Sequence, residues 1–380
     1  MSAPDITDAE VDAVVQVLRS DQLSLGPRVV AFEELSATWA GTRHAVAVSN
    51  GTAALHLAAI AAGIGTGDLV ITTPFSFVSS ANCLLYEGAE PVFADVDPVT
   101  GNIDPALVAE QAAVIANGPQ AGRLKAIIPV HTFGQPAAMD PICAVARERG
   151  LTVIEDACEA IGARYRGRPV GSLGDVGAFA FYPNKQMTTG EGGMLVTSRD
   201  DWRDLFRSLR NQGRDAFDAW LTHSRLGFNY RLDEMSGALG TVQLSRLDEM
   251  LAKRAQVAGW YTERLAPHGD LLQCPVIVGD TTRMSWFVYV VRVPSRIDRD
   301  ALMRSLDERG IPSRAYFAPI HLQPLYRARF GFRPGDFPVA EDVGRRSLAL
   351  PFSSVMTEDQ VEAVCAELLD ALMNQLAHMA

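Results

Sequence analysis

The sequence predicts an α/β protein with a mostly parallel, seven-stranded sheet in a large domain, followed by a smaller α+β domain. Between residues 45 and 197, short apolar runs alternate with small-residue turns and helical patterns, which is typical of a parallel sheet covered by helices on both faces. The chain has 380 residues, more than one ordinary core requires. After about residue 245 the alternation stops. We therefore expect a large domain over residues 1–245 and a small one over 246–380.

The elements are predicted in order from local patterns. Residues 7–20 should form a helix that begins with a capping box, since Thr7 is followed by Glu10 and then by an apolar face. The seven strands are expected at 45–49, 69–73, 91–96, 126–131, 152–156, 177–182 and 193–197. The second domain should contain a helix over 244–265, a strand over 285–293 and a closing helix over 357–376. Ligands of parallel sheets bind beyond the carboxyl ends of the strands, where functional residues are therefore expected.

Composition excludes several functional classes. The net charge is −11 and charges of both signs are mixed, which disfavours a nucleic-acid surface. The five cysteines are widely spaced, and the N-terminus is polar and acidic, so we expect reduced thiols and a cytoplasmic protein. The most apolar window, AVAVSNGTAALHLAAIAAGI, is interrupted by polar residues and predicts no membrane span. The seven histidines lack metal-ligand spacing, so we predict no metal.

Lys185 stands in the segment FYPNKQMTTGEGG, in a chain with three lysines among 34 basic residues. It is either a surface lysine of a loop or an amine that attacks a carbonyl to form a Schiff base. The apolar run before it indicates burial, and the glycines after it allow the backbone to approach a ligand closely. These flanking residues favour the second interpretation.

Asp156 ends the strand predicted over 152–156, within TVIEDACEAIG. One interpretation is a cap for a helix predicted to begin at Ala157. The other is an anion that keeps a pyridine nitrogen protonated, so that the ring can accept electrons from a substrate. The presence of Lys185 after the next strand favours the functional interpretation.

Two further segments follow predicted strands. In VSNGTAALHLAA, Gly51 and Thr52 open a helix whose free N–H groups and partial positive charge suit a phosphate. Neither a P-loop nor a dinucleotide-binding spacing is present there. In PFSFVSS, Phe77 either lies flat on a planar cofactor or belongs to the core.

Together these segments resemble the DegT/DnrJ/EryC1/StrS family of sugar aminotransferases, which have the fold of type I pyridoxal-phosphate enzymes. The resemblance covers nearly the whole chain. It extends from SDQLSLGPRVVAFEE through SNGTAALHLAA, VIEDACEAIGA, FYPNKQMTTGEGGML and LGFNYRLDEMSGALG to IHLQPLY. It implies pyridoxal 5′-phosphate as cofactor, with Lys185 as the Schiff-base lysine that later moves a proton. It further implies that Asp156 pairs with the pyridine nitrogen, that Phe77 stacks on the ring, and that Gly51 and Thr52 hold the phosphate.

The resemblance also implies a homodimer with shared sites, since Asn229 would reach the phosphate bound to the neighbouring subunit. Tyr316 and His321 would help to bind the substrate. The sequence departs from the family pattern twice: Ala180 replaces a serine that bonds the phosphate, and Glu159 replaces a glutamine that contacts the phenolic oxygen of the cofactor.

The function implied is transfer of an amino group from L-glutamate to a keto-sugar linked to a nucleotide, as in the biosynthesis of polysaccharide or antibiotic sugars. One alternative substrate is a free keto-cyclitol. Another alternative is a regulator that binds a ligand without catalysis, which predicts loss of the lysine or the aspartate. Both Lys185 and Asp156 are retained.

Overall fold

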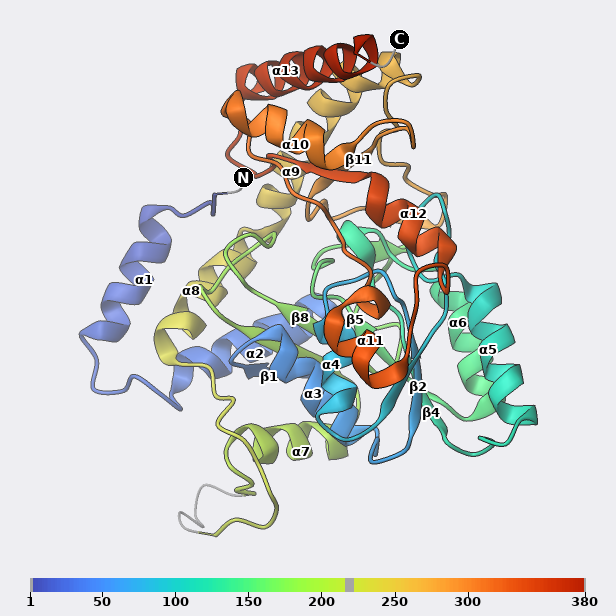
Figure 1. Cartoon of the computed structure of the whole chain (residues 1–380). Helices are drawn as coiled ribbons and strands as arrows, with labels where there is room; N and C mark the ends of the chain where they lie inside the picture. The colour runs from blue at the N-terminus through green and yellow to red at the C-terminus, as the bar shows by residue number, and fades with distance from the viewer. Residues whose placement is uncertain (1–2, 216–221, 379–380) are drawn as a thin grey trace.

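The computed structural model describes residues 3–215 and 222–378 (Figure 1). Its centre is a seven-stranded sheet in the order β1 (His44–Val48), β9 (Gly193–Thr197), β8 (Val176–Ala180), β5 (Thr152–Asp156), β4 (Leu124–Ile128), β2 (Leu69–Thr72) and β3 (Glu90–Phe93). Strand β9 is antiparallel to both β1 and β8, and the remaining neighbours pair in parallel. The predicted α/β fold with a mostly parallel sheet is confirmed.

Helices cover both faces of this sheet because its strands alternate between two apolar layers. Val46, Val70 and Ile154 face a core formed with α3 (Gly51–Ala61), α4 (Ser79–Leu85) and α7 (Asp200–Arg210). Their neighbours Ala47 and Ile71 face the other side. There the sheet packs against α2 (Pro27–Ala40), α5 (Pro105–Asn117), α6 (Met139–Arg149) and α8 (Glu234–Ser245). Burial on both faces explains the nearly continuous apolar runs in the sequence.

The N-terminal helix α1 (Asp8–Leu18) packs against α8 at the edge of the molecule (Figure 1). Its predicted capping box is present: the Thr7 N–H donates to the Glu10 carboxylate at 2.9 Å. Glu10 also accepts hydrogen bonds from Gln243 (2.8 Å) and Arg246 (2.6 Å). The helix is therefore fixed to the residues that follow the large sheet.

The C-terminal part has a core of its own around two antiparallel strands, β11 (Tyr289–Arg292) and β12 (Ser347–Leu350). The helices of this part are α9 (Leu247–Leu265), α10 (Arg299–Glu308), α11 (Pro324–Phe330), α12 (Pro338–Arg346) and α13 (Glu358–Ala377). The first turns of α9, from Leu247 to Leu251, pack with the core of the large sheet. The domain division at residue 245 therefore stays a prediction.

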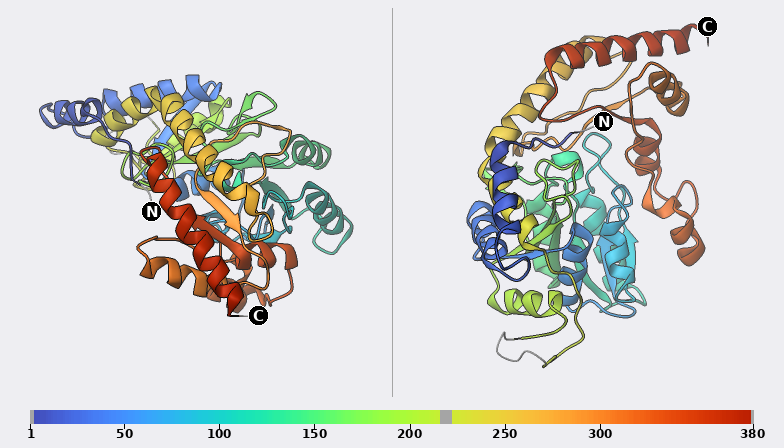
Figure 2. Two further views of the ribbon diagram at one scale, coloured as in Figure 1. Left: turned by 90° about the horizontal axis from the view of Figure 1, so that it is seen from above. Right: turned by 90° about the vertical axis from the view of Figure 1, so that its left-hand side faces the viewer.

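Figure 2 places α13 at the opposite end of the molecule from α7. A small sheet joins the two parts through β10 (Thr281–Arg283), which pairs with β6 (Arg164–Tyr165), itself paired with β7 (Arg168–Pro169). Among the helices that the structure describes, none combines the length and the apolar character needed to cross a bilayer.

Candidate active site

A cavity of about 450 Å³ opens at the carboxyl ends of the parallel strands. Its walls come from the segments that follow β1, β2, β5 and β8, and from the C-terminal part of the chain. Seven of the predicted site residues line it: Gly51, Thr52, Phe77, Asp156, Glu159, Lys185 and Tyr316. Residues far apart in the sequence therefore meet at the position expected for a parallel sheet.

Asp156, the last residue of β5, is 4 % exposed and its carboxylate is held by two donors. The Ser80 hydroxyl donates to Oδ2 at 2.6 Å, and the Cys158 N–H donates to Oδ1 at 3.1 Å. A carboxylate has about four lone-pair positions, so Asp156 can accept a further hydrogen bond from a ligand in the cavity. A cationic N–H group is the partner that this buried anion favours most.

Lys185 lies in the loop between β8 and β9, where its N–H donates to the Tyr182 carbonyl at 2.9 Å. Its amine Nζ is 3.9 Å from the centre of the Phe287 ring and 3.7 Å from Oε1 of Glu159. The ring face and the carboxyl group thus hold the end of the side chain inside the cavity.

Glu159 is buried beside Lys185, and its Oε2 accepts the Phe133 N–H at 3.0 Å. Burial raises the pKa of the Glu159 carboxyl group, and the Lys185 amine opposes this shift. Tyr316 lies close enough to be affected: burial and the negative charge of Glu159 both raise the pKa of its phenol. Burial in this site therefore disfavours the charged form of Glu159, compared with a carboxyl group exposed to water.

The N-terminus of α3 forms one end of the cavity. Asn50 caps the helix by accepting the Ala53 N–H at 2.8 Å, which leaves the N–H groups of Gly51 and Thr52 without intrahelical acceptors. The Thr52 hydroxyl lies 2.7 Å from that of Ser79. These donors together suit an anion.

Close packing explains why residue 51 is glycine. A Cβ atom there would lie 2.7 Å from Cβ of Ala180 and 2.9 Å from Sγ of Cys158. Helix α3 therefore touches the end of β8 directly, and Ala180 forms part of the cavity wall.

Phe77 is 61 % exposed and lines the cavity, so the alternative of a core aromatic is wrong. Its ring is free to cover a planar ligand. Tyr182, also exposed, lines the cavity as well.

Two predicted residues do not line the cavity. His321 is fully buried, with its Nε2 atom 3.0 Å from Glu341 and its ring 4.7 Å from that of Phe337. The structure thus packs the His321 side chain against Phe337 and Glu341, away from the cavity. This corrects our expectation that His321 contacts the substrate. Asn229 is exposed and its main chain bridges to Asn211. A role for Asn229 needs a neighbouring subunit and stays a prediction.

Sequence reasoning missed two residues that contact the predicted ones, Ser80 and Phe287. Ser80 could have been found from the three serines in PFSFVSS that directly follow a buried strand. Asn184, which the sequence suggested as a further donor to the phosphate, precedes Lys185 and lines the cavity. Phe287 carries no local signal, since only the tertiary fold brings it beneath the Lys185 amine.

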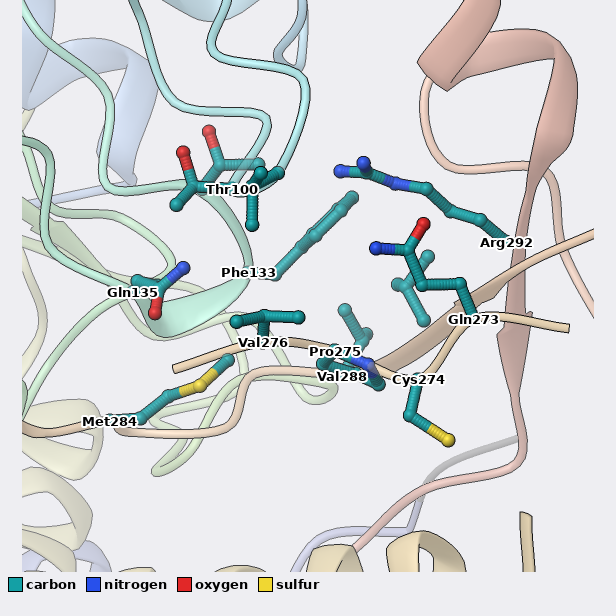
Figure 3. A pocket seen from close by; sticks show the side chains of 13 residues that line it. Thr100, Phe133, Gln135, Gln273, Cys274, Pro275, Val276, Met284, Val288 and Arg292 are labelled. Carbon is teal, nitrogen blue, oxygen red and sulfur yellow. The ribbon is translucent and has the colours of Figure 1, made fainter. Parts of the chain in front are cut away.

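A second cavity lies between the two parts of the chain (Figure 3). Thr100, Phe133 and Gln135 line it from one side, and Gln273 and Arg292 from the other. Its volume of about 30 Å³ is far smaller than that of the first cavity, and no predicted site residue lines it. No group of three metal-ligating side chains is found over residues 3–215 and 222–378.

The chain matches the model of the DegT/DnrJ/EryC1/StrS aminotransferase family over residues 4–369. It is 42 % identical to the GDP-perosamine synthase of Caulobacter vibrioides, with 98 % of each chain covered. It is 39 % identical to the spore coat polysaccharide biosynthesis protein SpsC of Bacillus subtilis, over 97 % of this chain and 96 % of that one.

Among solved structures, S. venezuelae DesV in complex with a ketimine intermediate is similar, with a TM-score of 0.87 and 35 % identity. The match covers 96 % of this chain and 94 % of DesV. Sequence and fold agree along nearly the whole length, and the chain therefore belongs to the DegT/DnrJ/EryC1/StrS aminotransferase family.

Proposed function

We propose that this protein is a pyridoxal 5′-phosphate-dependent sugar aminotransferase that moves an amino group from L-glutamate to a keto-sugar linked to a nucleotide. Membership in the family makes it an aminotransferase and implies this cofactor. The names of the relatives from Caulobacter and Bacillus support a sugar substrate, and the first supports a nucleotide-linked one. The observation that carries the proposal is the meeting of Asp156, Lys185 and the α3 N-terminus in one cavity.

The residues present fit the cofactor in charge and in size. Asp156 offers a buried acceptor to a protonated ring nitrogen, and the start of α3 offers N–H groups to a phosphate. Phe77 presents an exposed ring at the cavity wall, and the cavity is of the size usual for cofactor sites. When bound, the cofactor supplies a reactive aldehyde carbon and a ring that accepts electrons.

Each of these side chains then has a stated task. Lys185 would hold the cofactor covalently through Nζ and move a proton to and from the reacting carbon of the substrate. Its position 3.7 Å from Glu159 and above the Phe287 ring restricts where that amine can reach. Asp156 would keep the ring nitrogen protonated, and its two hydrogen-bond donors fix the carboxylate for that purpose.

Glu159 would lie beside the phenolic oxygen of the cofactor. Burial raises the pKa of its carboxyl group, which lessens the repulsion that a carboxylate would exert on that oxygen. Tyr316 lines the cavity near Asn184 and would contact the substrate. We further propose a homodimer, in which Asn229 serves the site of the second copy, and a cytoplasmic location.

The test is amination of keto-sugars linked to GDP or dTDP, with L-glutamate as donor and a free keto-cyclitol for comparison. We expect turnover of a nucleotide-linked substrate, and loss of both turnover and covalent cofactor in Lys185→Ala. Lys125→Ala is the matched control, because Lys125 is exposed on β4 outside the cavity. Wild-type turnover by Lys185→Ala would refute the mechanism, and amination of the free cyclitol alone would refute the substrate class.

A further inference from the structure

Arg254, on α9, is a buried cation, and no carboxylate of residues 3–215 and 222–378 forms a salt bridge with it. It is 2 % exposed, and burial lowers the pKa of its guanidinium group to about 10. A buried charge is costly unless its hydrogen bonds are satisfied. The guanidinium group instead donates to three main-chain carbonyls.

The three acceptors belong to the residues around the reactive amine. Nη2 of Arg254 donates to the carbonyl of Lys185 itself at 2.9 Å. Nη1 donates to the carbonyls of Trp286 (3.1 Å) and Phe287 (3.2 Å). Phe287 provides the ring that lies 3.9 Å from Nζ of Lys185. One side chain thus fixes the backbone of both members of this cation–π contact.

The hydrogen bond from Arg254 to the Trp286 carbonyl has a second role, which follows from the backbone conformation at Trp286. Trp286 has a φ of 52°, in the left-handed region that bulky residues rarely adopt. Such a conformation persists only where surrounding contacts stabilise it. The hydrogen bond from Arg254 to the Trp286 carbonyl is one of these contacts, and it directs the next residue, Phe287, into the cavity.

The segment around Phe287 is also tied to the neighbour of Lys185. The Gln186 amide donates to the Ser285 hydroxyl at 2.8 Å and to the Glu159 carbonyl at 2.6 Å. The Phe287 N–H donates to the Phe133 carbonyl at 3.2 Å, and the Phe133 N–H binds Glu159. The hydrogen bonds of Arg254 and Gln186 therefore fix the relative positions of the backbone at Lys185, Glu159 and Phe287.

We propose that Arg254 is a positioning residue that sets the reach of the Lys185 amine from outside the cavity. The inference rests on the proposed function, in which Lys185 binds the cofactor. A lysine at position 254 would keep the charge, but its single ammonium group lacks the planar fork that reaches two peptide segments at once. The number and direction of the hydrogen bonds, rather than charge alone, carry the effect.

The test compares Arg254→Lys with Arg292→Lys. Arg292 is the control, because it is a half-buried arginine that donates to a main-chain carbonyl, that of Pro98, and it lines the small second cavity rather than the one that holds Lys185 (Figure 3). We expect kcat of Arg254→Lys to fall roughly 100-fold, the effect of misplacing a reacting group by about 1 Å, while KM for L-glutamate stays near the wild-type value. Arg292→Lys should keep the wild-type kcat.

A second readout does not depend on turnover. Pyridoxal 5′-phosphate is added to cofactor-free protein, and its capture by Lys185 is followed by visible absorbance, with borohydride reduction and peptide mass spectrometry to identify the residue. Capture should slow in Arg254→Lys and in Phe287→Leu, which keeps all three Arg254 hydrogen bonds because they end on main-chain atoms. Phe287→Leu keeps the test open if Arg254→Lys does not fold.

The outcomes separate the two proposals. Wild-type capture by Phe287→Leu, or wild-type kcat and capture by Arg254→Lys, would overturn the positioning role. Equal losses in Arg254→Lys and Arg292→Lys would overturn it too, because they would reflect general stability. Failure of wild-type protein to aminate any keto-sugar would refute the proposed function, while the capture rates would still decide the role of Arg254.

Discussion

The contact between Gly51 and β8 makes Gly51→Ala a stringent test of the phosphate end of the cavity. A Cβ atom at residue 51 would lie 2.7 Å from Cβ of Ala180 and 2.9 Å from Sγ of Cys158. Carbon atoms in contact prefer roughly 3.5–4.0 Å, so α3 and β8 must separate by about 1 Å. Ala180 cannot turn away, because its Cβ is attached directly to the strand. Overpacking of this kind costs about 1–3 kcal/mol of folding free energy.

The same displacement moves the N–H groups of Gly51 and Thr52, which we propose as phosphate donors. We expect Gly51→Ala to bind pyridoxal 5′-phosphate at least tenfold more weakly, since about 1.4 kcal/mol corresponds to a factor of ten in affinity. Urea unfolding of the cofactor-free protein measures the packing cost, and equilibrium titration with the cofactor measures the affinity.

Gly259→Ala provides the matched control, because it makes the same chemical change on α9, where nothing lies within 4 Å of the added Cβ atom. This variant should gain up to about 1 kcal/mol of stability and keep its cofactor affinity. In the double variant Gly51→Ala with Ala180→Gly, part of the affinity should return, because the shorter contact is removed. Wild-type stability and affinity in Gly51→Ala would refute the reasoning.

Three further expectations concern carboxyl groups. Burial raises the pKa of Glu159, so ionisation of this carboxyl group destabilises the fold by about 1.4 kcal/mol for each unit by which the pKa is raised. In urea unfolding, Glu159→Gln should be more stable than wild type at neutral pH and equal to it at pH values below the usual carboxyl pKa. A stability difference that stays constant across pH would contradict this. Burial alone would raise the pKa of Glu10, but hydrogen bonds, including one from Arg246, lower it to about 2. Glu10→Gln should therefore lose about 1–3 kcal/mol at pH 7, with the gap closing as the pH falls from 4.5 toward 2, and no loss at pH 7 would exclude that contribution. Ser80→Ala removes a 2.6 Å hydrogen bond to Asp156 and should weaken cofactor binding about tenfold in a titration, whereas unchanged affinity would show that the bond does not matter.

The strands were predictable because each is an apolar run that begins or ends at a small residue or a proline. The predicted strand over 126–131 ends earlier, at Ile128, since Pro129 has no N–H for the sheet. Strand β12 was missed, because its four residues, Ser347–Leu350, follow a helix directly and carry no turn signal. Its pairing with β11 depends on long-range packing that no local pattern encodes.

The functional residues at the ends of the strands were predictable because the strands themselves were. Asp156 and Lys185 follow strands of one sheet, so topology alone brings them to one edge. Phe287 and Arg254 could not be found in this way, because their contacts with Lys185 cross from a different core. For His321 the segment was known but the direction of the side chain was not, and packing turned it inward.

The walls of the cavity come from segments that are synthesised far apart in time, residues 50–192 and 287–317, and this has a consequence for biosynthesis. A ribosome-bound chain complete to β9 would already contain the helix N-terminus, the acid and the amine, but it would lack Phe287 and Tyr316. Domains generally fold as units during synthesis, the N-terminal one first. We therefore expect firm binding of pyridoxal 5′-phosphate only once the chain has been synthesised beyond Tyr316.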